Sequence, residues 1–307
     1  MEMSEEDLQF IEAQRKEDAL EPSLVHEYSD EIFHYMRDLE VTDDSPKSLK
    51  LGSCATMMPD PAYMDNQSEI QWEMRGVLID WLVQVHGRFQ MQNETLFLCV
   101  NFIDRFLSAK VVSVQKFQLV GVTALLLAAK FEEISAPSIA DLVYMVDNGY
   151  DAEEIKKAER YMVQLLNFEL GFPGPMSFLR RVSKADDYCQ STRTLAKYLV
   201  ELTIMDEKFI GITPSMIAAA GDMLARKFLK GSEGEWTPVH VHYSSYTAEQ
   251  LEDVAALIIE RAMDRNSHQS IYDKYADARY WKASVYVQQW FEKYGYQEEY
   301  FFPNSSR

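Results

Sequence analysis

Residues 74–82 read MRGVLIDWL, residues 101–107 read NFIDRFL and residues 118–133 read QLVGVTALLLAAKFEE. In the first stretch Met74, Val77, Leu78 and Trp81 recur at the i, i+3, i+4 and i+7 spacing of one helix face. The uncharged run from Phe117 to Ala129 is too short to cross a bilayer and predicts a buried core helix. The three stretches together predict a domain of packed helices.

Helix signals continue along the rest of the chain. Asn93, Ser113 and Thr213 before Pro214 are start signals, and the pairs Asp151/Glu154 and Thr247/Gln250 have the spacing of capping boxes. Strand signals are weak, because His240–Tyr243 is the only short alternating run worth noting. The predicted fold class is all-α.

An internal repeat divides the helical region. LLAAKF at 126–131 returns as MLARKF at 223–228, and the sequence GFPGP at 171–175 interrupts the helical pattern between them. We therefore expect two domains, 69–171 and 172–307, after an acidic segment, 1–68, that carries a helix at 24–39. Tyr28, Ile32 and Tyr35 lie on one face of that helix, and they bury either on their own chain or on a partner.

Composition excludes several classes of protein. The chain has 307 residues, 47% of them hydrophobic, which suffices for a sizeable core. Cys54, Cys99 and Cys189 form no Cys-x-x-Cys pair, so a reducing compartment is expected, without a disulfide scaffold or zinc site. The net charge is −19, and residues 1–50 contribute 15 acidic and 5 basic side chains to it. A nucleic-acid binder needs a basic face, so nucleic acid is not an expected partner. No secretory signal or membrane span is visible in the sequence. Residues 1–22 are expected to be at most partly helical.

The three opening stretches closely resemble the cyclin box. FLRRVSK at 178–184, TLAKYLVELT at 194–203, EWTP at 235–238 and KASVYVQQW at 282–290 are most similar to B-type, mitotic cyclins, especially fungal ones. This resemblance spans about residues 24–293. It implies two tandem five-helix domains and a regulatory subunit that activates a cyclin-dependent kinase as its heterodimer partner at the G2/M transition. It also implies a location in nucleus and cytoplasm, no catalytic residues of its own and no cofactor.

The resemblance also implies which residues contact the kinase. Lys130 and Glu159 match the Lys and Glu that grip the mobile helix of the kinase. From the residues alone, Lys130 suits the negative end of a helix dipole equally well, and for Glu159 an ordinary solvated helix face is the preferred interpretation. The further positions that match kinase contacts are Phe131, Glu132, Glu133, Ile134, Phe168, Tyr28, Ile32 and Tyr35.

A second surface is implied for substrates that carry Arg-x-Leu motifs. In cyclins the helix matching Met74, Val77, Leu78 and Trp81 stays partly open as a docking groove, although such apolar stripes usually pack into a core. Gln84, Gln118 and Phe117 match the rest of this groove. Some cyclins have Glu where this chain has Gln84, so we expect weaker docking, because a charged hydrogen bond contributes about 1.5–3 kcal/mol against about 1 for a neutral one.

Two other groups of charged residues stand out. The family places Arg75 and Asp104 in a buried salt bridge between the first two helices, and loss of one partner costs about 3–5 kcal/mol. Arg180, Arg193 and Lys197 lie in a locally basic window and are expected to converge on a phosphate of a phosphorylated partner. An ordinary solvated face is an equally good interpretation of that window.

Enzymatic interpretations find little support. The sequence has no phosphate-binding GxxxxGK[ST] loop, GxSxG elbow or HExxH helix. His240 and His242 lack further ligands at a recognisable spacing, so we expect loop histidines and no metal site. The alternative function is a transcription-associated cyclin-fold interaction module. Mitotic cyclins usually carry an Arg-x-x-Leu destruction box, and none precedes Arg75, so either the sequence is a piece of a longer protein or its degradation uses another signal.

Overall fold

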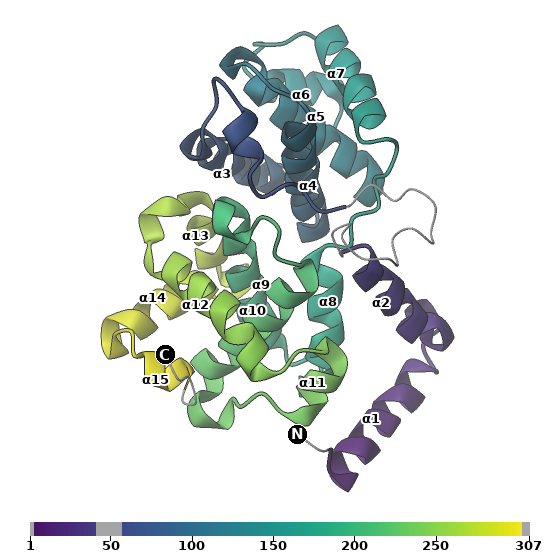
Figure 1. Ribbon diagram of the computed structural model, residues 1–307, viewed down its shortest axis with the longest axis vertical. Coiled ribbons are helices and arrows are strands. Elements are labelled where there is room, and N and C mark those ends of the chain that lie inside the picture. Colours follow the sequence, from purple (N-terminus) through teal and green to yellow (C-terminus); the bar gives the residue numbers. More distant parts are fainter. Residues whose placement is uncertain (1–2, 41–56, 303–307) are drawn as a thin grey trace.

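The computed structural model describes residues 3–40 and 57–302, and these residues form helices and no strand. The predicted all-α fold is confirmed. Figure 1 shows two helical domains, one above the other, with two further helices from the N-terminal region lying along the lower domain. Of the three cysteines, Cys54 lies outside the described residues.

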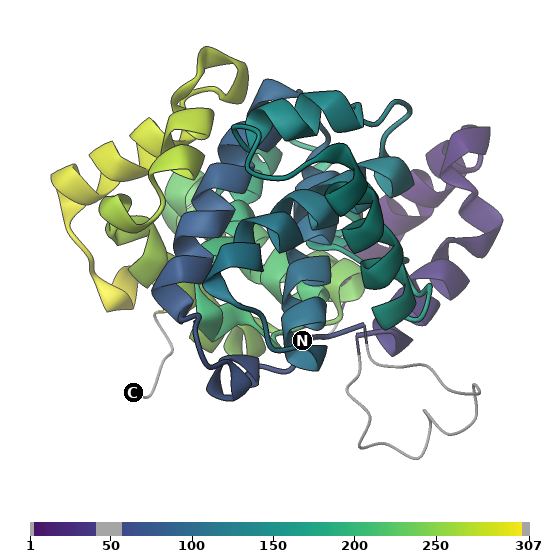
Figure 2. The same ribbon diagram turned by 90° about the horizontal axis from the view of Figure 1, so that it is seen from above.

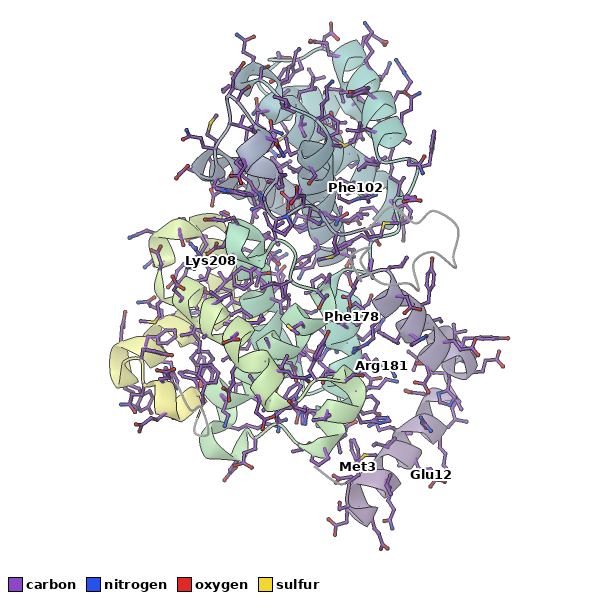
Figure 3. The ribbon with its side chains drawn as sticks, in the orientation of Figure 1. Met3, Glu12, Phe102, Phe178, Arg181 and Lys208 are labelled. Carbon is purple, nitrogen blue, oxygen red and sulfur yellow. The ribbon has the colours of Figure 1, made fainter. Side chains whose placement is uncertain are left out.

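The first domain contains the expected five helices around a central one, α5, which packs against α3, α4 and α7 (Figure 2). Gly121 of α5 allows this packing, because a Cβ there would lie 2.8 Å from Cδ1 of Leu78 on α3. Phe102 on α4 is fully buried in this domain (Figure 3). The helices are α3 (Trp72–Arg88), α4 (Asn93–Ala109), α5 (Val114–Glu132), α6 (Ile139–Met145) and α7 (Ala152–Leu165).

The helix α5 is longer than the uncharged run in its sequence, since Lys116 and Lys130 extend it at the two ends. It is the one described helix whose length and composition would allow it to cross a membrane. However, 67% of its apolar window is buried inside the protein, which is the behaviour of a core helix.

The second domain repeats the five-helix arrangement and adds three helices. Its central helix is α10, which packs against α8, α9 and α12 and contains the repeated MLARKF sequence. The five helices are α8 (Pro175–Val182), α9 (Gln190–Leu202), α10 (Pro214–Lys230), α11 (Pro238–Ser244) and α12 (Ala248–Met263). The additional helices, which the sequence analysis did not separate, are α13 (Gln269–Ala276), α14 (Ala283–Tyr294) and α15 (Glu298–Phe301).

Most of the predicted helix starts are confirmed. Complete capping boxes form at Asp151/Glu154 and Thr247/Gln250, and Ser113 and Thr213 occupy N-cap positions. At α4 the N-cap is Gln92, one residue before the predicted start, because the distant Glu133 carboxylate accepts hydrogen bonds from the Gln92 N–H and the Thr95 hydroxyl. The alternating run His240–Tyr243 is helical, since Pro238 starts α11 there.

The N-terminal region has two helices, α1 (Glu5–Asp18) and α2 (Ser29–Asp38), where one was expected at 24–39. Two 3₁₀ turns precede α2, and Val25 between them has a left-handed φ of 46°, which delays the helix to Ser29. Ser4 and Asp7 form a capping box that starts α1, so the described part of residues 1–22 is partly helical, as expected.

Helix α2 and Glu40, shortly after it, bind to the second domain. Asp30 forms an ion pair with Arg181 of α8 at 2.7 Å, and Phe33 packs on Phe178 with ring centroids 5.8 Å apart (Figure 3). The Glu40 carboxylate accepts hydrogen bonds from the backbone and side chain of Ser215 at the start of α10, each at 2.6 Å. The position of α2 is therefore set by the second domain.

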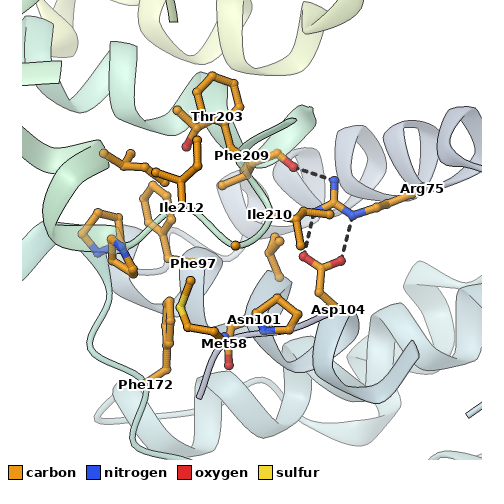
Figure 4. Close-up of a pocket in the computed structure, with 17 residues that line it drawn as sticks. Met58, Arg75, Phe97, Asn101, Asp104, Phe172, Thr203, Phe209, Ile210 and Ile212 are labelled. Atoms are coloured by element: carbon orange, nitrogen blue, oxygen red, sulfur yellow. Dashed lines mark hydrogen bonds and ion pairs between the residues drawn. The ribbon is translucent and has the colours of Figure 1, made fainter. Parts of the chain in front are cut away.

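The expected ion pair between Arg75 and Asp104 is present at the junction of the two domains (Figure 4). Nε and one terminal nitrogen of Arg75 donate to the two Asp104 oxygens at 2.8 and 2.7 Å, and the other terminal nitrogen donates to the Ile204 carbonyl at 3.0 Å. Tyr63 donates its hydroxyl proton to Asp104 at 2.8 Å. The pair therefore joins α3 to α4 and both helices to the second domain, beside a small, mostly apolar cavity of about 80 Å³.

Candidate partner-binding surfaces

The first surface lies where the C-terminal end of α5 meets α7. Lys130 Nζ lies 2.6 Å from Glu159 Oε1, so the two residues form an ion pair across 29 positions of sequence. The Lys130 side chain is 48% exposed and Glu159 only 17%. Glu159 is thus held in place against the protein, unlike the freely solvated side chain that its sequence context alone suggested.

Three exposed apolar side chains follow Lys130 or Glu159 closely in the sequence. Phe131 and Phe168 are 51% and 71% exposed, and Ile134 is fully exposed. Phe168 follows α7 with a φ of +61°, a strained conformation for a bulky residue. Apolar groups of this size on a surface indicate a protein-binding site.

Two acidic residues of the same segment have different surroundings. Glu133 caps the start of α4, so its carboxylate already has partners within the chain. Glu132 is exposed at the surface. The protein still shields part of its carboxyl group from water, and this desolvation, followed by the charges of Glu94 and Glu133, raises its pKa. Glu132 is therefore the residue of the two that is available to a partner.

Ile32 and Tyr35 on α2 are exposed, and so is Tyr28, the N-cap residue directly before it; the accessible fractions of Tyr28, Ile32 and Tyr35 are 50%, 42% and 54%. The opposite face of this helix packs on α8, and the Arg181 guanidinium lies 4.4 Å from the centre of the Phe33 ring. The stripe is thus not buried on its own chain. Figures 1 and 2 show α2 and α7 on the same side of the molecule.

The stripe along α3 is divided between core and surface. Leu78 and Phe117 are buried in the core of the first domain, Met74 and Trp81 are half-buried against it, and Val77 is 72% exposed. Gln84 donates a hydrogen bond to Asp80 at 3.0 Å, and Gln118 is half-buried. Of the residues expected in the docking groove, Leu78 and Phe117 are core residues and not part of the surface, whereas Met74, Val77, Trp81, Gln84 and Gln118 keep some exposed surface.

Arg180, Arg193 and Lys197 line one cavity of about 510 Å³. Lys274 and Arg279, from a part of the chain about 80 residues further on, line the same cavity. Nε of Arg193 is buried without a hydrogen-bond partner, and burial, followed by the charge of Arg193, lowers the pKa of Lys197. Both observations indicate cations held close together with unused donors.

Two basic residues of the same sequence window are occupied elsewhere. Arg181 pairs with Asp30, and Lys184 pairs with the buried Asp18 of α1. The basic residues around position 180 therefore form two groups: Arg181 and Lys184 hold the N-terminal helices, and Arg180 lines the cavity. Sequence inspection could not have found Lys274 and Arg279, because no local signal connects them with residue 193.

The two histidines singled out in the sequence lie on α11 and not in a loop, so that expectation is wrong. His240 is buried, whereas His242 is half-buried with its ring centroid 5.0 Å from that of Tyr243. Pro238 at the first helical position is the physical reason, because it favours a helix start.

Comparison with known proteins agrees with this architecture. Residues 44–171 match the family described as "Cyclin, N-terminal domain", and residues 173–289 match "Cyclin, C-terminal domain". The chain belongs to the cyclin family. The two matched regions meet next to the domain boundary expected near residue 172, and the first begins 25 residues before the expected start at 69.

The cyclins that this chain resembles are fungal and carry mitotic names. It is 50% identical to the G2/mitotic-specific cyclin-4 of Candida albicans over 276 residues, which cover 90% of this chain and 54% of that protein. It is 46% identical over 277 residues to the G2/mitotic-specific cyclin cdc13 of Schizosaccharomyces pombe, with the same coverage of 90% and 54%. This cyclin thus spans about half the length of the curated relatives it matches.

Two solved structures share the fold at low identity. A viral cyclin from herpesvirus saimiri matches with a TM-score of 0.52 and 17% identity, covering 72% of this chain and 91% of that one. A chain of the yeast RNA Pol II CTD kinase CTDK-1 complex matches with a TM-score of 0.57 and 12% identity, covering 68% and 72%. These likenesses support the cyclin fold alone.

Proposed function

We propose that this cyclin is the regulatory subunit of a cyclin-dependent protein kinase, which it binds and activates at the G2/M transition. The observation that carries the proposal is the Lys130–Glu159 ion pair, with exposed Phe131, Ile134 and Phe168 in the adjoining segments. The unburied Tyr28–Ile32–Tyr35 stripe on the same side of the molecule offers a second contact for the same partner. The mitotic names of its relatives support the timing.

The mechanism we propose is allosteric. The cyclin contributes a rigid surface that presses the mobile helix of the kinase inward, so that a kinase Glu pairs with the ATP-binding Lys and the activation loop is ordered. The catalytic residues then belong to the kinase. We propose a location in nucleus and cytoplasm, where a mitotic kinase acts.

A swap of the two charges tests the proposal. Lys130→Glu together with Glu159→Lys preserves an ion pair between the same two positions but reverses the polarity that a partner meets. We expect helicity and Tm to stay close to those of the unmodified cyclin, and activation of a mitotic kinase, measured by histone phosphorylation, to fall at least tenfold.

The matched control is Glu153→Lys with Lys156→Glu, which swaps an exposed ion pair of 2.8 Å on the same helix. This variant should activate the kinase normally. Full activation by the Lys130/Glu159 swap would contradict the proposed surface, and loss of helicity in that swap would assign the pair a structural role instead.

We also propose two recognition sites beyond the kinase contact. The accessible part of the α3 stripe would take Arg-x-Leu motifs of substrates or inhibitors, weakly because Gln84 is neutral and already bonded to Asp80. The cavity of Arg180, Arg193 and Lys197 would take a phosphate of a phosphorylated partner. Its support is the unpartnered Arg193 Nε and the convergence of Arg180, Arg193, Lys197 and Arg279 on one cavity, which Lys274 also lines while paired with Glu201.

A further inference from the structure

A buried polar cluster in the second domain has no task in the proposed kinase function. It consists of Asp186, at the end of a 3₁₀ turn after α8, Asp222 in the middle of α10, and His240 on α11. One oxygen or nitrogen atom from each residue lies within 4.8 Å of the other two. Asp222 is 1% exposed and His240 is 2% exposed.

The atoms that face one another in this cluster lack protein partners. Among the described residues, no hydrogen-bond donor or acceptor reaches either Asp222 oxygen, Oδ2 of Asp186 or Nε2 of His240. The distance from His240 Nε2 to Asp186 Oδ2 is 3.7 Å, which is too long for a hydrogen bond. Buried polar atoms nearly always have a partner, so several unpartnered atoms gathered within 4.8 Å of one another indicate a ligand between them.

The spacing and the outer contacts suit a metal ion. Two ligand atoms at the roughly 2.0–2.1 Å bond lengths of zinc lie about 3.4 Å apart in a tetrahedral site, close to the separation of His240 and Asp186. His240 Nδ1 is hydrogen-bonded to the Thr237 hydroxyl at 2.7 Å, which orients the ring with Nε2 toward the carboxylates.

We propose that Asp186, Asp222 and His240 bind one divalent metal ion with the ligand preferences of Zn²⁺. Asp186 would contribute Oδ2, Asp222 a carboxylate oxygen and His240 Nε2, with water in the remaining position. The ion would join the 3₁₀ turn after α8 to α10 and α11, and so stabilise the half of the second domain on which α1 and α2 are anchored.

Neighbouring cations set the affinity of this site. Arg226 and Lys230 both pair with Oδ1 of Asp186, the latter at 3.0 Å, so their charges oppose a bound dication. Lys230→Gln removes one of them at the domain surface and should tighten Zn²⁺ binding severalfold. A protonated Asp222 is the competing explanation, since burial, followed by the charge of Asp186, raises its pKa to about 7.

The experiment measures zinc bound to the full chain. The protein is stripped with a chelator, incubated with excess Zn²⁺, desalted and analysed for metal content and Tm. We expect about one zinc per chain and a higher Tm in zinc, and at least a tenfold weaker affinity for Asp222→Asn and for His240→Gln. His242→Gln, on the same helix, is the matched control and should bind zinc normally.

Cysteines are the main source of adventitious zinc binding, so two further measurements address them. Cys189→Ser should retain the metal, and Co²⁺ in place of Zn²⁺ should give visible ligand-field bands without a thiolate charge-transfer band. These also decide the question if Asp222→Asn or His240→Gln fails to fold. No retained zinc in the unmodified chain, equal retention in Asp222→Asn, or a thiolate band would overturn the proposal in favour of a protonated Asp222, while kinase activation could persist in each case.

Discussion

Replacement of Arg75 by Met should destabilise the first domain severely. The side chains of Arg75 and Asp104 are 3% and 5% exposed, so the substitution leaves a buried carboxylate with the Tyr63 hydroxyl as its one remaining donor from this network. Breaking a buried ion pair from one side costs about 3–5 kcal/mol. Because the two domains share a core, they unfold as a unit of more than about 150 residues, for which each kcal/mol lowers Tm by about 2–4 °C, so we expect a fall of at least about 6 °C.

The second partner provides the control. Arg75→Met combined with Asp104→Asn removes the stranded charge while an amide oxygen still accepts from Tyr63, so the double variant should recover more than half of the lost stability. Thermal unfolding of the full chain, followed by circular dichroism, measures both effects. A loss below about 1 kcal/mol in the single variant, or a double variant no more stable than the single one, would show that Asp104 is not left as an isolated buried charge.

Three other predictions concern docking, phosphate recognition and pH. Val77→Ala should weaken phosphorylation of Arg-x-Leu substrates severalfold and spare short active-site peptides, because Val77 is exposed and its truncation leaves the core intact; equal losses in both substrate classes would argue against a groove. Gln84→Glu should strengthen that docking at low salt, although repulsion from Asp80 limits the gain. Arg180→Ala, Arg193→Ala and Lys197→Ala together should reduce binding of phosphoserine peptides at least tenfold without changing histone phosphorylation, and unchanged peptide affinity would remove the phosphate site. Burial raises the pKa of Glu40 to about 7, against the lowering effect of the Ser215 hydrogen bonds, so the folded protein binds this proton more strongly than the unfolded chain does. The contribution of this proton to the free energy of unfolding is complete below about pH 4.5 and is lost as the pH rises through about 7. Glu40→Gln, which mimics the protonated form, should therefore match the unmodified chain in Tm at pH 5 and exceed it at pH 8, and the same Tm difference at both values would contradict the shift.

Local features of the fold could be predicted from the sequence, because their causes are local. Asp151 and Thr247 start helices through side chains three residues away, and Pro214 fixes a first helical position wherever it occurs. The exact start of α4 could not be predicted, because its cap is Glu133, about 40 residues further on. The same limit hid α1, whose buried Ile11 packs on Val239 and Tyr243 of the second domain.

The candidate sites were predictable to different degrees. The residues around Lys130 and Glu159 were identified by resemblance, whereas their own sequence context indicated only a helix end and a solvated face. Arg180, Arg193 and Lys197 were found from local charge, but Lys274 and Arg279 are brought to them by tertiary structure. For Asp222 the sequence does contain one local signal, because it is a lone carboxylate within an otherwise small and apolar stretch of α10.

The anchoring of α2 has a mechanical consequence. The tyrosine stripe moves with the second domain, through Asp30, Phe33 and Glu40, whereas Lys130 and Glu159 move with the first. A partner that contacts both areas therefore spans two domains. These domains are held together by the Arg75–Ile204 and Ser270–Asp80 hydrogen bonds and by a shared hydrophobic core that includes Ile79 and Phe97. The distance between these areas is set by the packing of the two domains on each other, so a substitution in that shared core, far from either contact area, would change which partners fit both.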